Sequence, residues 1–322
     1  MTEQLAETII KITGAKAIAK TSLIQELWSG YGQILRCELE GGSSTSVIVK
    51  HVQPPDETNH PRGWNTSRSH ERKLKSYQVE MNWYGHLAER CDGSCRIPKT
   101  LHVDDEKCLM IMEDLNEAGF PIRKSEVSLS EIKVCLKWLA NFHAKFMSAK
   151  GDGLWPIGTY WHLDTRPDEL EAMQDQQLKA AAKRIDEVLN QAKYQTLVHG
   201  DAKLANFCFS KDCTRVAAVD FQYIGHGCGM KDVAYLLSSC LHEEDLSNCE
   251  SELLKFYFDN LKISLLEQDQ SVDFEDIQQE WSLLYRYAWA DFYRFLDGWS
   301  PGHWKMHDYS ENIKNKVLND LE

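Results

Sequence analysis

Two short stretches decide how this sequence is interpreted: Leu197-Val198-His199-Gly200-Asp201-Ala202-Lys203-Leu204-Ala205-Asn206 and Val219-Asp220-Phe221-Gln222. In the first, an apolar strand leads into a loop in which Asp201 and Asn206 are five residues apart. In the second, another apolar strand ends in Asp220, fourteen residues after Asn206. This order suits metal-dependent phosphoryl transfer. Asp201 would orient or deprotonate an attacking hydroxyl, while Asn206 and Asp220 would hold Mg²⁺ through hard oxygen ligands.

The same residues have a structural alternative as turn and capping residues. For an isolated His-Gly-Asp that alternative is the better one. Here the order and spacing of His199, Asp201, Asn206 and Asp220 together favour the functional interpretation.

These stretches resemble the protein-kinase-like phosphotransferases that act on small molecules. This group includes aminoglycoside phosphotransferases, choline kinases and the ecdysteroid-kinase-like (CHK) proteins. Their catalytic loop reads H-G-D-x-x-x-x-N, which His199 to Asn206 match, and their metal-binding Asp lies in I-D-F-Q or I-D-W-E, which resembles Asp220 in VDFQ. The resemblance implies that His199 is structural and braces the loop.

A third segment, Gly227 to Leu237, resembles the DLAxxL helix of the same group. Gln222 and Tyr235 favour the ecdysteroid-kinase-like branch. The resemblance covers about residues 20–300 and is specific near 197–237. It implies an α+β, two-lobed protein-kinase-like fold with a mainly β N-terminal lobe and a mainly α C-terminal lobe.

The pattern along the chain predicts the same division. Residues 3–20 have helical periodicity, and strands follow from Leu23. The other predicted elements are a helix near 70–90, strands at 97–103 and 108–112, helices at 128–149 and 167–193, strands at 196–198 and 216–220, and mostly helix over 230–317. We therefore expect a nucleotide-binding lobe at 1–112, a hinge at 113–116 and a catalytic and acceptor-binding lobe at 117–322.

A kinase of this kind needs a positive charge on a rigid strand for the ATP phosphates, and Lys50 ends the strand VIVK. A glutamate on the following helix normally orients that lysine. Glu80 is the first candidate and Glu71 the second. A solvated lysine at a strand end is the structural alternative for Lys50.

Other nucleotide contacts are expected in two places. Gly30 and Gly32 lie in a loop where backbone N–H groups could approach phosphates, although an ordinary hairpin turn is the default for such a pair. The resemblance places adenine near Met112, with backbone groups of Glu113 and Leu115 on the base edge. The Pro-, Asn- and Ser-rich insert 53–70, which contains Trp64, is predicted to be a mobile flap near the site.

Composition excludes several other classes. The chain has 322 residues and a formal net charge of −13, which argues against a broad nucleic-acid surface. It has no window of ~18 apolar residues and no signal-peptide pattern near its start. The ten cysteines suit reduced thiols. We therefore expect a cytoplasmic monomer or homodimer without membrane or nucleic-acid partners.

The sequence indicates the phosphate acceptor less clearly than it indicates the catalytic residues. Residues 241–280 contain twelve Asp/Glu and two Lys, and aromatic residues are frequent over 281–304, where Asp291 could face a ligand. Both features have structural alternatives, a solvated acidic face and a buried aromatic stripe. We expect a neutral or cationic small-molecule alcohol, and the choice between a sterol-like and an amine alcohol stays open.

The leading hypothesis is therefore a small-molecule kinase that uses ATP and Mg²⁺, although the sequence does not distinguish ATP from GTP. A protein kinase is disfavoured because Gly200 replaces the loop Arg, VDFQ replaces D-F-G, and no A-P-E-like segment follows. A nucleotide-binding scaffold without catalysis is the other alternative. It has no chemical need for Lys50, Asp201, Asn206 and Asp220 together.

Overall fold

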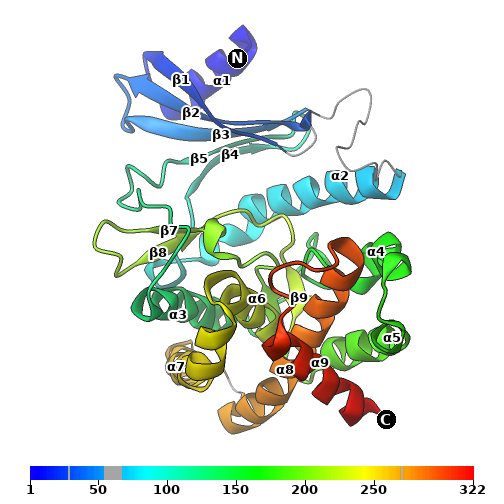
Figure 1. Cartoon of the computed structure of the whole chain (residues 1–322). Helices are drawn as coiled ribbons and strands as arrows, with labels where there is room; N and C mark the ends of the chain where they lie inside the picture. The colour runs from blue at the N-terminus through cyan, green and yellow to red at the C-terminus, as the bar shows by residue number, and fades with distance from the viewer. Residues whose placement is uncertain (28–29, 54–66, 269, 271) are drawn as a thin grey trace. The chain divides into compact units, whose positions relative to one another are not determined.

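The computed structural model describes residues 1–27, 30–53, 67–268, 270 and 272–322. The chain forms two compact units, which are residues 1–122 with 208–222, and residues 123–207 with 223–322 (Figure 1). The predicted hinge at 113–116 falls in the first unit, and its role as a hinge stays a prediction. Positions 54–66 of the predicted flap, including Trp64, lie outside the described residues.

The first unit is built on a five-stranded antiparallel sheet in the order β1-β2-β3-β5-β4. Its strands are β1 (Ala17–Glu26), β2 (Gly32–Glu40), β3 (Ser46–Val52), β4 (Thr100–Asp104) and β5 (Leu109–Glu113). β3 lies in the middle and is hydrogen-bonded on both edges. A side chain on β3 is therefore held on a rigid backbone.

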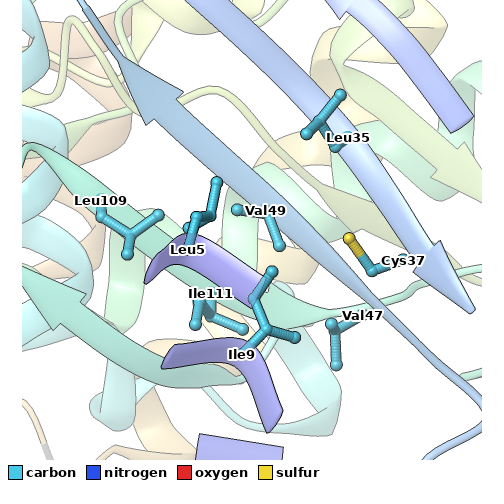
Figure 2. Close-up of a cluster of buried hydrophobic side chains, with 8 residues drawn as sticks. All are labelled: Leu5, Ile9, Leu35, Cys37, Val47, Val49, Leu109 and Ile111. Atoms are coloured by element: carbon cyan, nitrogen blue, oxygen red, sulfur yellow. The ribbon is translucent and has the colours of Figure 1, made fainter. Parts of the chain in front are cut away.

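Helix α1 (Glu3–Thr13) covers one face of this sheet. Leu5 and Ile9, one helical turn apart, pack on alternate residues of three strands, as Figure 2 shows: Leu35, Cys37, Val47, Val49, Leu109 and Ile111. Because successive side chains of a strand point to opposite faces, Lys50 faces away from α1. The expectation of helical structure as far as residue 20 was wrong. Gly14 ends α1 in a left-handed conformation, with φ 66°, and β1 starts at Ala17.

Helix α2 (Ser67–Asn82) packs on the opposite face through Tyr77, which clusters with Leu27, Tyr31 and Val52. A π-helical turn, Trp83–Leu87, continues α2 toward β4. The short strands β7 (Phe207–Phe209) and β8 (Val216–Ala218) form a two-stranded sheet. β8 leads directly to Asp220.

The second unit is mainly helical. Its described helices are α3 (Leu129–Lys145), α4 (Pro167–Ala172), α5 (Gln176–Asn190), α6 (Met230–Cys240), α7 (Glu243–Glu267), α8 (Phe274–Trp299) and α9 (Asp308–Leu321). The predicted helix at 167–193 is two helices, because Asp175 caps a new start for α5. Helix α8 packs against α4, α5, α6 and α9, and most of its second half is buried.

The second unit also contains a two-stranded antiparallel sheet of β6 (Thr196–Val198) and β9 (Gly225–Gly227). β6 leads into the loop that contains Asp201. Among the described residues, no helix has both the length and the apolarity needed to cross a bilayer.

Candidate active site

Lys50 and Glu80 form a buried ion pair in the first unit. Lys50 Nζ donates to Glu80 Oε2 at 2.5 Å, and the two residues are 3% and 2% exposed. Burial raises the pKa of the Glu80 carboxyl; Lys50 opposes the rise and Asp220 adds to it. Glu71, the alternative partner, is exposed. The partner of Lys50 is therefore Glu80.

Asp220 lies beside this pair. Its Oδ1 is 3.9 Å from Lys50 Nζ, and its backbone has φ 70°, a region that non-glycine residues seldom adopt and that Asp tolerates better than most. Outliers of this kind cluster at functional sites.

The two residues after Asp220 attach it to helix α2 and the turn that follows. The Phe221 ring stacks on Trp83 with centroids 5.0 Å apart. Gln222 Oε1 accepts hydrogen bonds from Lys73 Nζ at 3.0 Å and Ser76 Oγ at 3.2 Å. Helix α2 therefore positions both Glu80 and Asp220 relative to Lys50.

The glycines of the predicted loop lie at the junction of β1 and β2, where backbone hydrogen bonds join Leu27 to Gly30 and Gly32. Leu27 N donates to Gly32 O at 2.8 Å, and Gly30 N donates to Leu27 O at 3.1 Å. Gly32 has φ 122°, and a Cβ there would lie 2.1 Å from His51 O, so no other residue fits. Trp28 and Ser29 lie outside the described residues. A role of Gly30 and Gly32 in phosphate binding stays a prediction.

Met112, Glu113 and Leu115 lie at the end of β5 and just after it. Met112 is buried, and the Glu113 side chain accepts from Arg96. The Glu113 N–H donates to Lys99 O, and the Leu115 C=O accepts from Phe120 N–H. Two of the backbone groups that were expected to contact a base thus form hydrogen bonds within the first unit. The adenine contact stays a prediction.

In the second unit, the loop after β6 brings Asp201 and Asn206 into direct contact. Asn206 Nδ2 donates to Asp201 O at 2.8 Å and to Asp201 Oδ2 at 3.0 Å. This leaves the Asn206 amide oxygen, which is the atom a metal ion needs, without a hydrogen bond to the described part of the chain. Lys203 Nζ also donates to Asp201 Oδ2, at 2.8 Å. Asp201 thus faces an amide and an ammonium group.

His199 and Gly200 hold this loop in place. The backbone N–H groups of His199 and Gly200 donate to the two carboxylate oxygens of Asp232, at 2.6 and 2.9 Å. His143 Nε2 lies 3.1 Å from the same carboxylate. Gly200 has φ 80°, and a Cβ there would lie 2.1 Å from Tyr223 O. The glycine of His-Gly-Asp is therefore a steric requirement of this loop.

Sequence reasoning missed the roles of Asp232, Lys203 and Tyr235. Asp232 lies inside the Gly227–Leu237 segment, so its motif was visible but its contact with the loop was not. Lys203 lies within the quoted loop itself. Burial, Tyr160 and the Asp201 carboxylate raise the pKa of the Tyr235 hydroxyl. The Tyr235 ring lies 5.4 Å from that of Tyr160, whose N–H donates to Gly200 O at 3.1 Å.

The aromatic stretch of α8 is a core stripe, as its spacing indicated: Trp281, Leu284, Tyr285, Ala288, Phe292 and Phe295 are buried. Asp291 does not face a ligand, contrary to expectation. It is 1% exposed, accepts from Trp161 Nε1 at 2.9 Å, and pairs with Arg294 at 2.8 Å. Its carboxylate therefore anchors α8 to the segment before α4.

The structure thus places the predicted residues in two sets, one in each unit. The sequence profile of the ecdysteroid kinase-like family matches residues 32–152 and 158–269, which together are more than half of the chain and span both sets. This chain belongs to the ecdysteroid kinase-like family. No curated protein sequence matches it.

Solved structures show the fold of this ecdysteroid kinase-like protein. A putative fructosamine-3-kinase from Thermobifida fusca is 13% identical with a TM-score of 0.52, over 98% of this chain and 99% of that chain. The amicoumacin kinase hAmiN, in complex with AMP-PNP, Ca²⁺ and Ami, is 12% identical with a TM-score of 0.51, over 100% and 93%. The predicted α+β protein-kinase-like fold, with a β-sheet N-terminal region and a helical C-terminal region, is confirmed.

Proposed function

We propose that this chain is an ATP- and Mg²⁺-dependent phosphotransferase that phosphorylates a hydroxyl group of a small molecule. The main support is the buried Lys50–Glu80 pair with Asp220 3.9 Å from the lysine. A buried ion pair contributes little net stability, because desolvation of both charges offsets their attraction. An arrangement that brings together residues from β3, α2 and the segment after β8 is better explained by binding of nucleotide phosphates.

The oxygen ligands fit Mg²⁺. Asp220 would supply a carboxylate, and Asn206 would supply the amide oxygen that its hydrogen bonds to Asp201 leave open. Mg²⁺ is commonly held by one or two protein oxygens together with substrate phosphates rather than by a protein cage. When bound, the ion would neutralise charge on the transferring phosphoryl group.

Asp201 would accept the proton of the acceptor hydroxyl. Its Oδ2 is already held by Asn206 and Lys203, which would keep the carboxylate in one orientation during the transfer. His199 would act only through the loop, by way of the hydrogen bonds to Asp232. Lys50 would bind the α- and β-phosphates, and Glu80 would hold its ammonium in place.

The comparisons support the proposal at the level of the family. The matching family is named for kinase-like proteins, and hAmiN, which shares the fold, is a kinase solved with AMP-PNP and Ca²⁺. A purely structural role for the charged residues would not require Lys50, Glu80, Asp201, Asn206 and Asp220 together.

The test is a screen of sterol alcohols and amine alcohols with Mg-ATP and Mg-GTP, in which phosphorylated products are detected by mass spectrometry. Formation of a phosphorylated alcohol supports the proposal. Nucleotide binding without any phosphorylated alcohol would indicate a non-catalytic scaffold, and phosphorylation of a protein substrate instead would indicate a protein kinase.

A companion measurement tests the metal ligand. Calorimetry of ATP binding with and without Mg²⁺ should show a Mg²⁺-dependent gain in the wild-type chain and a much smaller gain in Asp220→Ala. Asp212→Ala is the matched control, because Asp212 lies on the turn between β7 and β8 and its carboxylate is held by Ser210 and Thr214. An unchanged metal dependence in Asp220→Ala would remove that residue from the proposed site.

A further inference from the structure

An aromatic cluster in the second unit touches the loop that contains Asp201, because the Tyr160 N–H donates to Gly200 O at 3.1 Å. It combines side chains of α6, α8 and the segments at 160–161 and 299–306: Tyr160, Trp161, Tyr235, Phe292, Phe295, Leu296, Trp299 and Met306. The Tyr235 ring lies 5.4 Å from the Tyr160 ring and 5.1 Å from the Phe292 ring. If Asp201 is the base of the proposed reaction, these rings are close to the reacting hydroxyl.

The chain places its own cation in this cluster. Lys305 Nζ lies 4.9 Å from the centroid of the Tyr235 ring, 5.3 Å from Phe292 and 5.5 Å from Trp304. Lys305 is 9% exposed, whereas Trp304 is half exposed. Lysine often buries only its methylene stem and keeps the ammonium in water. Here the ammonium itself lies among three rings, in the geometry of a cation–π site.

No ion pair among the described residues accounts for this ammonium. Within the described part of the chain, its one hydrogen bond is a long one to Ser238 Oγ, at 3.4 Å, and no carboxylate lies within 4.0 Å of it. The Asp201 charge acts on it from farther away. Lys314 provides the contrast, because it lies 5.3 Å from the Tyr293 ring but is paired with Asp175 at 2.8 Å.

Other parts of the chain hold Lys305 in position. Its backbone N–H donates to His303 Nδ1 at 3.2 Å, and its carbonyl accepts from Ser310 Oγ at 2.9 Å. The pKa of Lys305 is lowered to about 8, mainly by burial and to a small extent by Lys203, while Cys240 and Asp201 oppose the change. The lysine is thus fixed in place among the rings although burial disfavours its charge.

We propose that Lys305 determines acceptor specificity: its ammonium fills the aromatic cluster near Asp201, so the site disfavours alcohols that carry a quaternary ammonium and favours isosteric alcohols without a positive charge. This inference rests on the proposed function, because it treats the surroundings of Asp201 as the acceptor site. A second positive charge beside Lys305 would be repelled in this poorly hydrated environment.

Choline and 3,3-dimethyl-1-butanol form a matched pair of probes, since they differ mainly in the charged nitrogen that replaces a carbon. Ligand-observed NMR titrations without nucleotide give both affinities. We expect the wild-type chain to bind dimethylbutanol roughly tenfold or more tightly than choline. Lys305→Met should shift the affinity ratio toward choline by roughly tenfold or more, because the rings and the Asp201 charge remain while the internal cation is removed.

Three controls make the ratio interpretable. Lys305→Arg should keep the wild-type preference, since it keeps the charge. Lys305→Gln repeats the loss of charge if the Met variant does not fold, which thermal unfolding would reveal. Lys314→Met removes a lysine that also lies over a ring, in a different part of the second unit, and should leave the ratio unchanged.

A distorted site would weaken the binding of both probes alike and leave the ratio of their affinities unchanged. Only a loss of charge at position 305 changes that ratio. The proposal is overturned if both neutral variants keep the wild-type ratio, if the wild-type chain prefers choline, or if it binds neither probe. No nucleotide or turnover enters this measurement. A chain that binds the probes as expected but phosphorylates no alcohol would disprove the proposed function and leave the specificity of the cluster standing.

Discussion

The β3–α2 region of the first unit and the aromatic cluster of the second unit both bury a lysine ammonium, but they compensate its charge differently. Lys50 has a carboxylate at 2.5 Å, whereas Lys305 has three rings and no carboxylate within 4.0 Å among the described residues. A carboxylate holds its partner lysine in position and also neutralises the charge of that lysine. Aromatic rings hold a cation without neutralising it. The first region is therefore suited to hold a lysine ready for phosphates, and the second keeps a net positive charge that can discriminate between ligands.

The largest expected effect separates chemistry from nucleotide binding. Asp201→Asn should lower turnover by ~10²–10⁴, the usual contribution of a positioned general base. ATP affinity measured by calorimetry should stay near the wild-type value, because the Lys50–Glu80 pair is intact. Asp164→Asn is a matched control in the same unit, since that side chain is 87% exposed. Wild-type turnover in Asp201→Asn would disprove the assignment.

The next largest effect tests Lys50, the lysine whose charge is compensated by a carboxylate. Glu80→Ala leaves the Lys50 charge buried and should lower the free energy of unfolding by about 3–5 kcal/mol, measured by urea denaturation. The double variant Lys50→Met/Glu80→Leu removes both charges and should lose clearly less stability than Glu80→Ala. If the double variant loses as much as the single one, packing rather than charge pairing explains the effect.

Much of this site could be predicted because its chemistry lies close together in the sequence. Asp201 and Asn206 are five residues apart, and their contact is local. To predict the role of Glu80, it was enough to predict the helix that follows β3, because α2 presents Glu80 to Lys50. The fold class followed from the contrast between alternating strands and helical spacing, and from the resemblance carried by residues 197–237.

The remaining features depend on contacts between distant parts of the chain. Asp232 is more than thirty residues from the backbone groups that it binds, and Lys305 reaches rings of α6 and α8 from a loop with no motif. Asp291 looked available on a helical wheel, yet Trp161, which is 130 residues away, occupies its carboxylate. The early end of α1 was missed because Ile18 continued a helical pattern that Gly14 had already broken.

Lys305, whose charge is compensated by aromatic rings, should make the free energy of unfolding depend on pH. The pKa of Lys305 is lowered to about 8 by burial, whereas an unfolded lysine has a pKa of ~10.4. Below pH 8 both states hold the proton, and the full penalty for burying the charge is present. As the pH rises from 8 toward ~10.4, the folded chain releases its proton first. Its free energy of unfolding should therefore rise by about 3 kcal/mol relative to Lys305→Met.

Urea denaturation of both chains across this pH range gives the difference directly, because other titrating groups are shared and cancel. Lys314→Met is the control. Although burial opposes it, the Asp175 carboxylate raises the pKa of Lys314, so that lysine stays protonated in both states over most of this window. A difference between wild type and Lys305→Met that does not change with pH would show that the lysine is not buried as a cation.

The smallest effect distinguishes the rings from the hydrogen bond as the support of Lys305. Ser238→Ala removes the one acceptor that the described residues offer to this ammonium, but the 3.4 Å distance makes that bond weak. The Ser238 hydroxyl also donates to Tyr235 O at 2.8 Å, a bond that contributes about 1 kcal/mol. We therefore expect urea denaturation at pH 7 to show a loss of about 1 kcal/mol, far below that of Glu80→Ala. The preference for dimethylbutanol over choline should persist. A loss of about 3 kcal/mol together with a reversed preference would mean that Ser238, rather than the rings, keeps Lys305 in the cluster. The comparison with Lys50 would then be between a hydroxyl and a carboxylate, and not between rings and a carboxylate.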